Sequence, residues 1–241
     1  MSGAVKHYNW RTKTNWGDRL GPLLLERFAG ISSVWAPFPE AQIVTVGSVL
    51  QLMPWDWPGI IAGAGKLRRD SPFKYGSHTQ IMALRGPLTA RGVTGSYALG
   101  DPGLLAPELL GQLPVKEHAL GILPHWFDKK LEHRTEFRRY DPLIIHADED
   151  PLEVVRKIGS CRKLVTSSLH GVIVADAFHI PRRVEQMDLS RKDTNFKFMD
   201  YGGSIRMRFR FGITEMPKWQ RIEDRQHEIY DVFRDIEGRL R

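Results

Sequence analysis

Short apolar runs alternate with amphipathic stretches along most of this chain, and that alternation limits the folds open to it. The apolar runs predict buried strands at 43–47, 59–63, 96–100, 119–123, 142–146 and 163–166. The amphipathic stretches predict helices at 20–29, 79–84, 87–91, 151–158 and 169–178. Alternation of this kind is typical of parallel sheets with helices on both faces.

A pause in the alternation, around Pro107–Val115, predicts a boundary between two parts. We expect two small doubly wound, Rossmann-like halves, at residues 1–113 and 114–216. In residues 217–241 apolar side chains recur at spacings of three and four, which predicts a long helix packed along one stripe. The predicted fold class is therefore α/β, with two Rossmann-like halves and a long C-terminal helix.

Composition narrows the class of protein. The one cysteine, Cys161, excludes an intramolecular disulfide and a cysteine-based metal cluster, and it fits a reducing cytoplasm. The first residues lack the apolar segment of a signal peptide, and no apolar run is long enough to span a bilayer, so we expect a cytoplasmic protein. The net charge of +7 favours anionic ligands or surfaces, but its basic residues are too scattered to indicate nucleic-acid binding.

The segment Ser167–Gly171 falls where an apolar run turns into a predicted helix. Such a junction presents free backbone N–H groups and a partial positive charge, which together attract phosphate or carboxylate. His170, in the first turn, could exchange a proton with an anion bound there. The alternative is that Ser167 or Ser168 only caps the helix and His170 is a surface histidine.

Other polar segments also follow predicted strands or precede predicted helices. In Asn15–Gly21, Asp18 is placed to cap the helix that begins at Leu20. Arg85 precedes Pro87, a good first residue of a helix, so its guanidinium could clamp an anion at that N-terminus. Glycines that follow predicted strands could let the backbone approach a ligand closely, and the residues concerned are Gly47, Ser48, Gly63, Gly65 and Lys66. They do not form a Walker loop, because its sequence pattern is absent.

An Asp-x-Asp pair, Asp148 and Asp150, is typical of metal sites in some sugar-transfer enzymes. Here Asp150 precedes Pro151 and an apolar-periodic run, which favours a helix cap. No two of the nine histidines have the spacing of a metal-binding pair. We therefore expect no required metal.

Taken in order, these segments resemble the polysaccharide pyruvyl transferase family, and most of all the branch that modifies bacterial exopolysaccharides such as succinoglycan. The similarity covers roughly residues 9 to 205. The segments that carry it are Asn15–Asp18, Leu84–Pro87, Gly100–Leu104, Leu123–Trp126, Ser167–Gly171, Ala175–Pro181 and Phe196–Tyr201.

The resemblance implies a two-domain fold like that of the GT-B glycosyltransferases, with the site between the domains. It implies phosphoenolpyruvate as donor substrate, no other cofactor, and a cyclic pyruvate ketal as product. The acceptor would be an oligosaccharide or a lipid-linked glycan, and the basic surface is compatible with peripheral contact at the cytoplasmic membrane face. Many family members hold the donor with an arginine where this chain has Ser168, so a basic partner is expected elsewhere, from Arg85, Lys66 or Arg182.

In that setting His170 is the candidate general acid, and His125 is either an alternative acid or a base on the acceptor. Trp126 could stack on a sugar, Asp101 is expected to hold a turn, and Asp200 either closes over the site or pairs with an arginine. The residues expected to bind substrate are Asn15, Asp18, Gly47, Ser48, Gly63, Gly65, Lys66, Arg85, Trp126, Ser167, Ser168 and Leu169.

Two other functions stay open at this point. One is a sugar-nucleotide-dependent glycosyltransferase on the same architecture, although no carboxylate is well placed for a ribose. The other is a non-catalytic carbohydrate- or anion-binding protein that has kept the fold.

Overall fold

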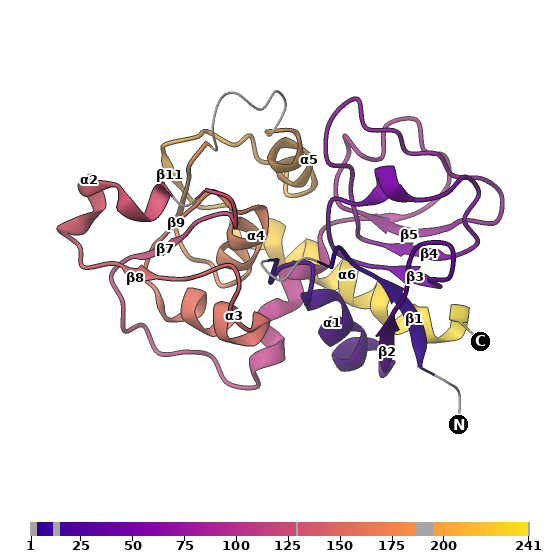
Figure 1. Cartoon of the computed structure of the whole chain (residues 1–241), viewed down its shortest axis with the longest axis horizontal. Coiled ribbons are helices and arrows are strands. Elements are labelled where there is room, and N and C mark those ends of the chain that lie inside the picture. Colours follow the sequence, from indigo (N-terminus) through magenta and orange to yellow (C-terminus); the bar gives the residue numbers. More distant parts are fainter. Residues whose placement is uncertain (1–3, 12–14, 129, 187–194, 241) are drawn as a thin grey trace.

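The computed structural model describes residues 4–11, 15–128, 130–186 and 195–240, arranged around two separate sheets (Figure 1). The first sheet has six parallel strands in the order β2-β1-β3-β4-β5-β6. Its strands are Val5–Tyr8 (β1), Ser33–Trp35 (β2), Ile43–Val44 (β3), Ile60–Ala62 (β4), Gln80–Leu84 (β5) and Ala98–Leu99 (β6). We call this part the first half.

The second sheet forms the second half and has the order β11-β10-β9-β7-β8. Its strands are parallel except for β11, which runs antiparallel to β10. They are Gly121–Leu123 (β7), Leu143–Ile144 (β8), Leu164–Thr166 (β9), Arg182–Val184 (β10) and Thr214–Glu215 (β11). Two mostly parallel sheets and a long last helix confirm the predicted α/β class.

The helices begin and end largely where local chemistry favours it. Asp150 caps α3 by accepting a hydrogen bond from the Leu152 N–H at 2.9 Å, and Pro151 is the first helical residue. The prediction that Asp150 is a helix cap is therefore confirmed. Gly30 ends α1 in the left-handed conformation, with φ of 64°. The α-helices are Leu20–Ala29 (α1), Thr135–Arg138 (α2), Pro151–Ser160 (α3), Leu169–Ala177 (α4), Phe196–Ser204 (α5) and Trp219–Leu240 (α6), and the 3-10 helices are Leu50–Leu52 (η1), Pro102–Leu110 (η2) and Leu131–His133 (η3).

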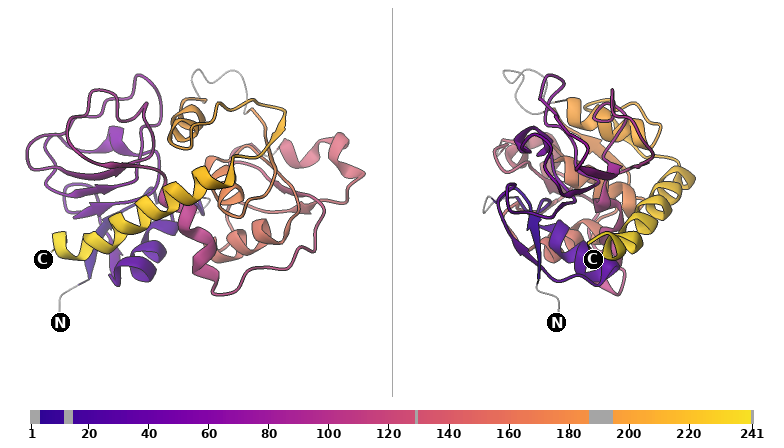
Figure 2. Two further views of the ribbon diagram at one scale, coloured as in Figure 1. Left: turned by 180° about the vertical axis from the view of Figure 1, so that it is seen from behind. Right: turned by 90° about the vertical axis from the view of Figure 1, so that its right-hand side faces the viewer.

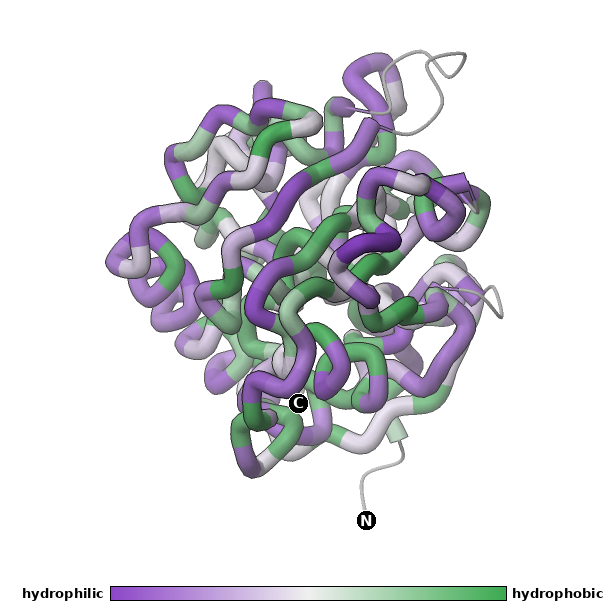
Figure 3. Tube along the Cα trace, turned by 90° about the vertical axis from the view of Figure 1, so that its left-hand side faces the viewer, coloured by the Kyte–Doolittle hydropathy of each residue, from purple (hydrophilic) through white to green (hydrophobic). Residues whose placement is uncertain are grey.

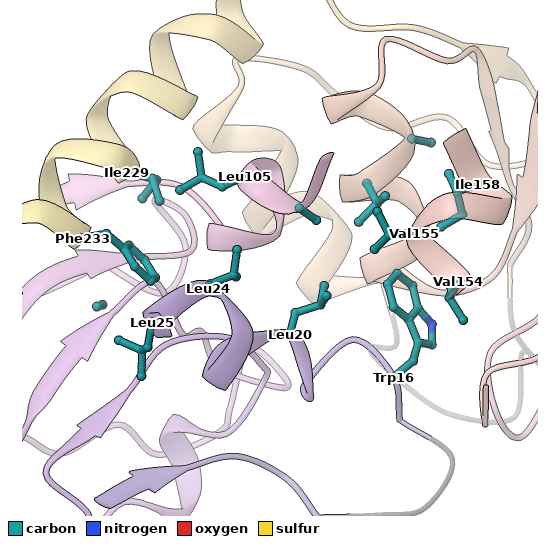
Figure 4. Close-up of a cluster of buried hydrophobic side chains, with 14 of the residues drawn as sticks. Trp16, Leu20, Leu24, Leu25, Leu105, Val154, Val155, Ile158, Ile229 and Phe233 are labelled. Carbon is teal, nitrogen blue, oxygen red and sulfur yellow. The ribbon is translucent and has the colours of Figure 1, made fainter. Parts of the chain in front are cut away.

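One apolar core joins the two halves. Figure 4 shows side chains of α1, such as Leu24, beside Leu105 of η2, Val155 of α3 and Phe233 of α6. The last helix, α6, returns to the first half, where it packs against α1, η2, β5 and β6, and Figure 2 shows it running along the back of the molecule. Hydrophobic segments gather inside while hydrophilic ones lie at the periphery (Figure 3). The arrangement of the two halves is thus held by buried apolar contacts.

Several segments differ from the sequence predictions. Most of the predicted helix 79–84 is strand β5 instead, because a short apolar run is compatible with either element and here it pairs with β4 and β6. Residues 87–91 form turns rather than a helix. Strands β1, β2, β10 and β11 were not predicted, since each is short and mixes polar or charged residues with apolar ones or, in β11, has no apolar residue. Met1–Gly3, in the predicted first half, and Arg241, at the end of the predicted last helix, lie outside the described residues.

Within the described part of the chain, no helix is both long and apolar enough to cross a membrane.

Replacing Phe233 by alanine tests the shared core. The Phe233 side chain is fully buried against both α1 and η2 neighbours, so Phe233→Ala should lower the free energy of unfolding by about 3–5 kcal/mol in urea titration. His227→Ala, at an exposed position on the same helix, is the control and should change it little. Equal losses in the two variants would contradict the role of α6 in the core.

Candidate active site

A pocket of about 420 Å³ opens where the two halves meet, and loops from both halves line it. Each of these loops follows the carboxyl end of a parallel strand, as expected for ligand sites in open α/β sheets. Helix α5, close to the junction of the two halves in Figure 1, adds one further residue, Lys197. The lining residues are Trp10, Asn15, Trp16, Asp18, Ser48, Val49, Gln51, Leu52, Leu67, Arg68, His125, Trp126, Phe127, Ala147, Ser168, Leu169, His170 and Lys197.

The N-terminus of α4 lines the inner end of the pocket, on the side that belongs to the second half. Ser168 caps this helix, since its Oγ accepts the Gly171 N–H at 3.4 Å, so the capping role is confirmed. Ser167 lies fully buried behind the wall, and its Oγ accepts the His125 N–H at 3.0 Å. Ser167 is therefore placed to support the His125 loop rather than to line the pocket.

His170 is not a surface histidine, because only 12% of its side chain is exposed. Its ring packs on Gly17, where a Cβ would lie 2.0 Å from Nδ1, so only glycine leaves room for this contact. Burial, with smaller contributions from Lys197 and Arg85, lowers the pKa of His170 to about 3.

Asp18 does not cap α1, contrary to the sequence prediction. Arg19 occupies the position before the helix, with no side-chain cap, and the Asp18 carboxyl points instead into the pocket wall. Its Oδ2 accepts a hydrogen bond from Asn15 Nδ2 at 2.6 Å, and its Oδ1 lies 3.7 Å from His170 Nε2. Gly47, with φ of 111°, makes room for it, since a Cβ there would lie 3.0 Å from Oδ1.

Burial raises the pKa of Asp18 to about 7. Lys197, the Asn15 hydrogen bond and Arg85 lower this pKa, and Asp101 raises it, but desolvation of the carboxylate is the largest cause. The pocket therefore holds a carboxyl group that is readily protonated next to an imidazole that is not.

Lys197 is a residue of the pocket lining that sequence reasoning did not single out. It is only 9% exposed, and among the described residues no hydrogen bond or ion pair of its ammonium group is found. Burial, and then Arg85, lower the pKa of Lys197 to about 8, while Asp18 raises it. The segment Phe196–Tyr201 was noticed in the sequence, but only the acidic residue in it was singled out, and no spacing marks this lysine.

Arg85, the predicted anion clamp, is held by partners within the protein. It lies fully buried at the end of β5, ahead of turns rather than a helix, and outside the pocket lining. Its guanidinium donates to Asp200 Oδ2 at 3.0 Å, to Ser48 Oγ at 2.6 Å and to the Lys66 carbonyl at 2.6 Å. The expectation that Asp200 pairs with an arginine is confirmed, and the pair joins the first half to α5.

Neither of the other basic candidates lines the pocket. Lys66 Nζ donates to the Arg69 carbonyl, and Arg182 is fully buried on β10 beside Asp176, with Nε 3.0 Å from its Oδ1. Gly65 leaves room for Arg85, since a Cβ would lie 2.4 Å from its Cζ, and Gly63 packs against Pro102. At both glycines a side chain of another segment occupies the space that a Cβ would need.

The pocket thus brings together eight of the predicted site residues: Asn15, Asp18, Ser48, His125, Trp126, Ser168, Leu169 and His170. Six others are not part of its lining: Gly47, Gly63, Gly65, Lys66, Arg85 and Ser167. Asp101 holds a turn, as expected, by accepting the Gly103 N–H at 2.9 Å at the start of η2.

The outer part of the pocket is more apolar than the inner end. Trp10 and Trp126 are each 42% exposed there, with the half-exposed Leu52 and Leu67 beside them in the lining. The His125 ring lies 4.0 Å from the Phe127 ring, centroid to centroid. Across the described residues, no group of three or more His, Cys, Asp or Glu side chains is arranged to hold a metal ion.

Fold and pocket together define an α/β protein of two Rossmann-like halves, with a pocket between them whose lining includes Asp18, His170 and Lys197. The family model of polysaccharide pyruvyl transferases matches residues 75–184. The succinoglycan biosynthesis protein ExoV of Rhizobium meliloti is 29% identical over 231 residues, which cover 86% of this chain and 66% of that protein. An uncharacterized protein of Acanthamoeba polyphaga mimivirus is 31% identical over 112 residues, or 44% of this chain and 39% of that protein.

These matches confirm the resemblance to the polysaccharide pyruvyl transferase family. The chain spans slightly less than two thirds of the length of the ExoV protein and well under half of the mimivirus protein. No solved structure matches the chain significantly.

The buried pair Arg85–Asp200 gives a prediction about stability. Asp200→Asn keeps the shape but removes the charge that balances Arg85, and both side chains are fully buried. We expect a loss of about 3–5 kcal/mol in the free energy of unfolding, measured by urea titration. Asp235→Asn, which breaks the exposed pair with Arg239, is the control and should cost far less. A small loss in Asp200→Asn would contradict the joining role of the pair.

Proposed function

We propose that this protein is a pyruvyl transferase that moves the pyruvyl group of phosphoenolpyruvate onto two hydroxyls of a sugar, to form a cyclic ketal in exopolysaccharide or cell-surface glycan synthesis. The family resemblance supports this proposal. The observation that carries it is the composition of the pocket. Asp18, His170 and the buried cation Lys197 line one pocket together with the N-terminus of α4. Such a site suits a small anionic donor that must accept a proton.

The donor would bind at the inner end of the pocket. Lys197 supplies a positive charge, and α4 presents backbone N–H groups at its N-terminus, where Ser168 and Leu169 line the pocket. Low local dielectric strengthens the attraction of a buried ammonium group for phosphate or carboxylate. In this proposal Lys197 takes the place of the arginine that many family members carry at the position of Ser168.

The acceptor would bind in the outer part. Trp10 and Trp126 offer half-exposed aromatic faces for a sugar ring, and His125 lies in the same wall, where it could take a proton from a hydroxyl. A glycan carried on a lipid would reach this open end from a membrane, and the net charge of +7 would favour contact with an anionic cytoplasmic face.

Ketal formation begins with a proton delivered to the methylene carbon of phosphoenolpyruvate, which leaves an oxocarbenium-like centre at C2. One hydroxyl then attacks C2 and loses its proton. The C2–O bond to phosphate breaks, its electron pair leaves with the phosphate, and the second hydroxyl closes the ring. The proton comes from the end of the pocket that holds Asp18 and His170. The His170 ring is buried and neutral in the free protein, so His170 either gains a proton when the anionic donor binds and raises its pKa, or takes part as the neutral partner of a neighbouring acid.

The first experiment is phosphate release from phosphoenolpyruvate, with and without a panel of galactosides, glucosides and mannosides. We expect acceptor-dependent release, and a loss of about 10²–10⁴-fold in His170→Ala, which should remain folded. A variant that retained most of its turnover would contradict the role of His170. Turnover with a nucleotide sugar instead would favour a glycosyltransferase, and absence of both activities would favour a binding protein.

Lys197→Met tests the donor site. Removal of the buried ammonium group should weaken phosphoenolpyruvate binding by about 10- to 100-fold in calorimetry, because hydrogen bonds to charged groups are the stronger ones. Lys66→Met is the matched control, since Lys66 lies outside the pocket lining and should leave affinity nearly unchanged. The reverse result, with Lys66 needed and Lys197 not, would contradict this assignment.

A further inference from the structure

Asp18 and His170 come from different halves of the molecule and meet at the inner end of the pocket. Asp18 follows β1 in the first half, His170 lies in the first turn of α4 in the second, and the carboxyl and imidazole are 3.7 Å apart. Both side chains are nearly buried, at 6% and 12% exposure. Within the described part of the chain, His170 Nε2 has no hydrogen-bond partner.

The two groups hold protons in the opposite order to the ordinary one. In water an aspartate is ionised near neutral pH, whereas a histidine is partly protonated. Here burial raises the pKa of Asp18 to about 7 and lowers the pKa of His170 to about 3. The charged or titratable groups that act on the two are Lys197, Arg85, Asp101 and Tyr8.

We propose that Asp18 and His170 form one acid–base dyad, in which Asp18 carries the proton delivered to the donor and neutral His170 is its hydrogen-bonding partner. This inference rests on the proposed function, and it assigns Asp18 a catalytic role rather than substrate binding alone. The separation of 3.7 Å exceeds a hydrogen bond, but catalytic contacts are often long before substrate binds and shorten in the complex.

With this dyad, each proton that moves in the reaction has a donor and an acceptor. Asp18 gives its proton to the methylene carbon of phosphoenolpyruvate, the electrons of the C=C bond form the new C–H bond, and C2 becomes electrophilic. The first sugar hydroxyl forms a C–O bond to C2 and returns its proton to the Asp18 carboxylate. When the second hydroxyl forms its bond to C2, the phosphate has left with the electron pair of its C–O bond, and that hydroxyl's proton leaves with the phosphate.

Donor binding should favour the protonated dyad. A phosphate and a carboxylate near Asp18 disfavour a further negative charge, so they raise its pKa above the value of about 7 in the free protein. The enzyme would therefore take up a proton with its donor when the surrounding pH is slightly alkaline, so that Asp18 is protonated while the donor is bound.

Infrared spectroscopy of the free protein tests where the proton lies. We expect a carboxylic acid C=O band that titrates near the pKa of about 7, is absent from Asp18→Asn and persists in the control Asp150→Asn, a helix cap outside the pocket. Asn15→Ala removes a hydrogen bond that stabilises the ionised carboxylate, so it should move the midpoint to higher pH. Ionised Asp18 from about pH 5 upwards, near the ordinary range of carboxylates, would overturn the proposal.

Calorimetry with phosphoenolpyruvate, in buffers of different ionisation enthalpy near pH 8, tests the dyad in action. We expect proton uptake by the wild type from both Asp18 and Lys197, because the anionic donor also raises the Lys197 pKa of about 8. This uptake should fall clearly in Asp18→Asn, which loses the Asp18 share, and should not fall in His170→Gln. Acceptor-dependent phosphate release should fall by about 10²–10⁴-fold in Asp18→Asn. Uptake that does not fall in Asp18→Asn but falls in His170→Gln would make His170 the acid and overturn the proposal. Failure of the wild type to bind phosphoenolpyruvate, with the Asp18 band present, would overturn the donor assignment while the protonated Asp18 stands.

Discussion

The ion pair between Arg85 and Asp200 is the contact on which the geometry of the pocket depends. Each partner is fully buried, and burial of a charge is costly unless its hydrogen bonds are satisfied. Ser48 Oγ and the Lys66 carbonyl accept further hydrogen bonds from Arg85, and Thr89 donates its N–H and Oγ1 to Asp200. All of these partners of the pair belong to the first half, whereas Asp200 lies on α5. Helix α5 can therefore satisfy its carboxylate only when it is seated against the first half.

That seating fixes Lys197 over the pocket, since it lies one turn before Asp200 on the same short helix. Gly86 and Gly203 allow the close approach, because a Cβ on either would lie 1.9 Å from the Asp200 carbonyl oxygen or 2.4 Å from Pro87 Cγ, respectively. The field in the pocket follows from this packing. Arg85 and Lys197 both lower the pKa of His170, while desolvation outweighs their effect on Asp18. A buried ion pair outside the pocket thus helps to set which group inside it holds a proton.

Sequence reasoning succeeded where local chemistry decides the outcome. The bounds of α1 were predicted to the residue, and Ser168 and Asp150 cap helices as their positions indicate. It failed where a distant partner decides. Pro87 made a helix after Arg85 look favourable, but Arg85 pairs with Asp200, 115 residues later, and no local pattern encodes that choice. Asp18 was predicted to cap α1 from its local sequence alone. In the structure its carboxyl instead accepts a hydrogen bond from Asn15 and lies close to His170.

This chain has Ser168 where many members of the family that it resembles have an arginine, and a cation from another element, Lys197, is compatible with that difference. A small residue there leaves α4 capped by its own hydroxyl, and the N-terminal N–H groups stay available to an anion. The cation can then come from any element that reaches the same cavity, and in this chain α5 reaches it. Binding of a small anion requires a positive charge close to the anion, but that charge need not come from an arginine at one fixed sequence position. An ammonium group beside a helix N-terminus can attract the same phosphate. On this argument the donor site could change its basic residue without a change of fold, provided that the Arg85–Asp200 pair kept α5 in place.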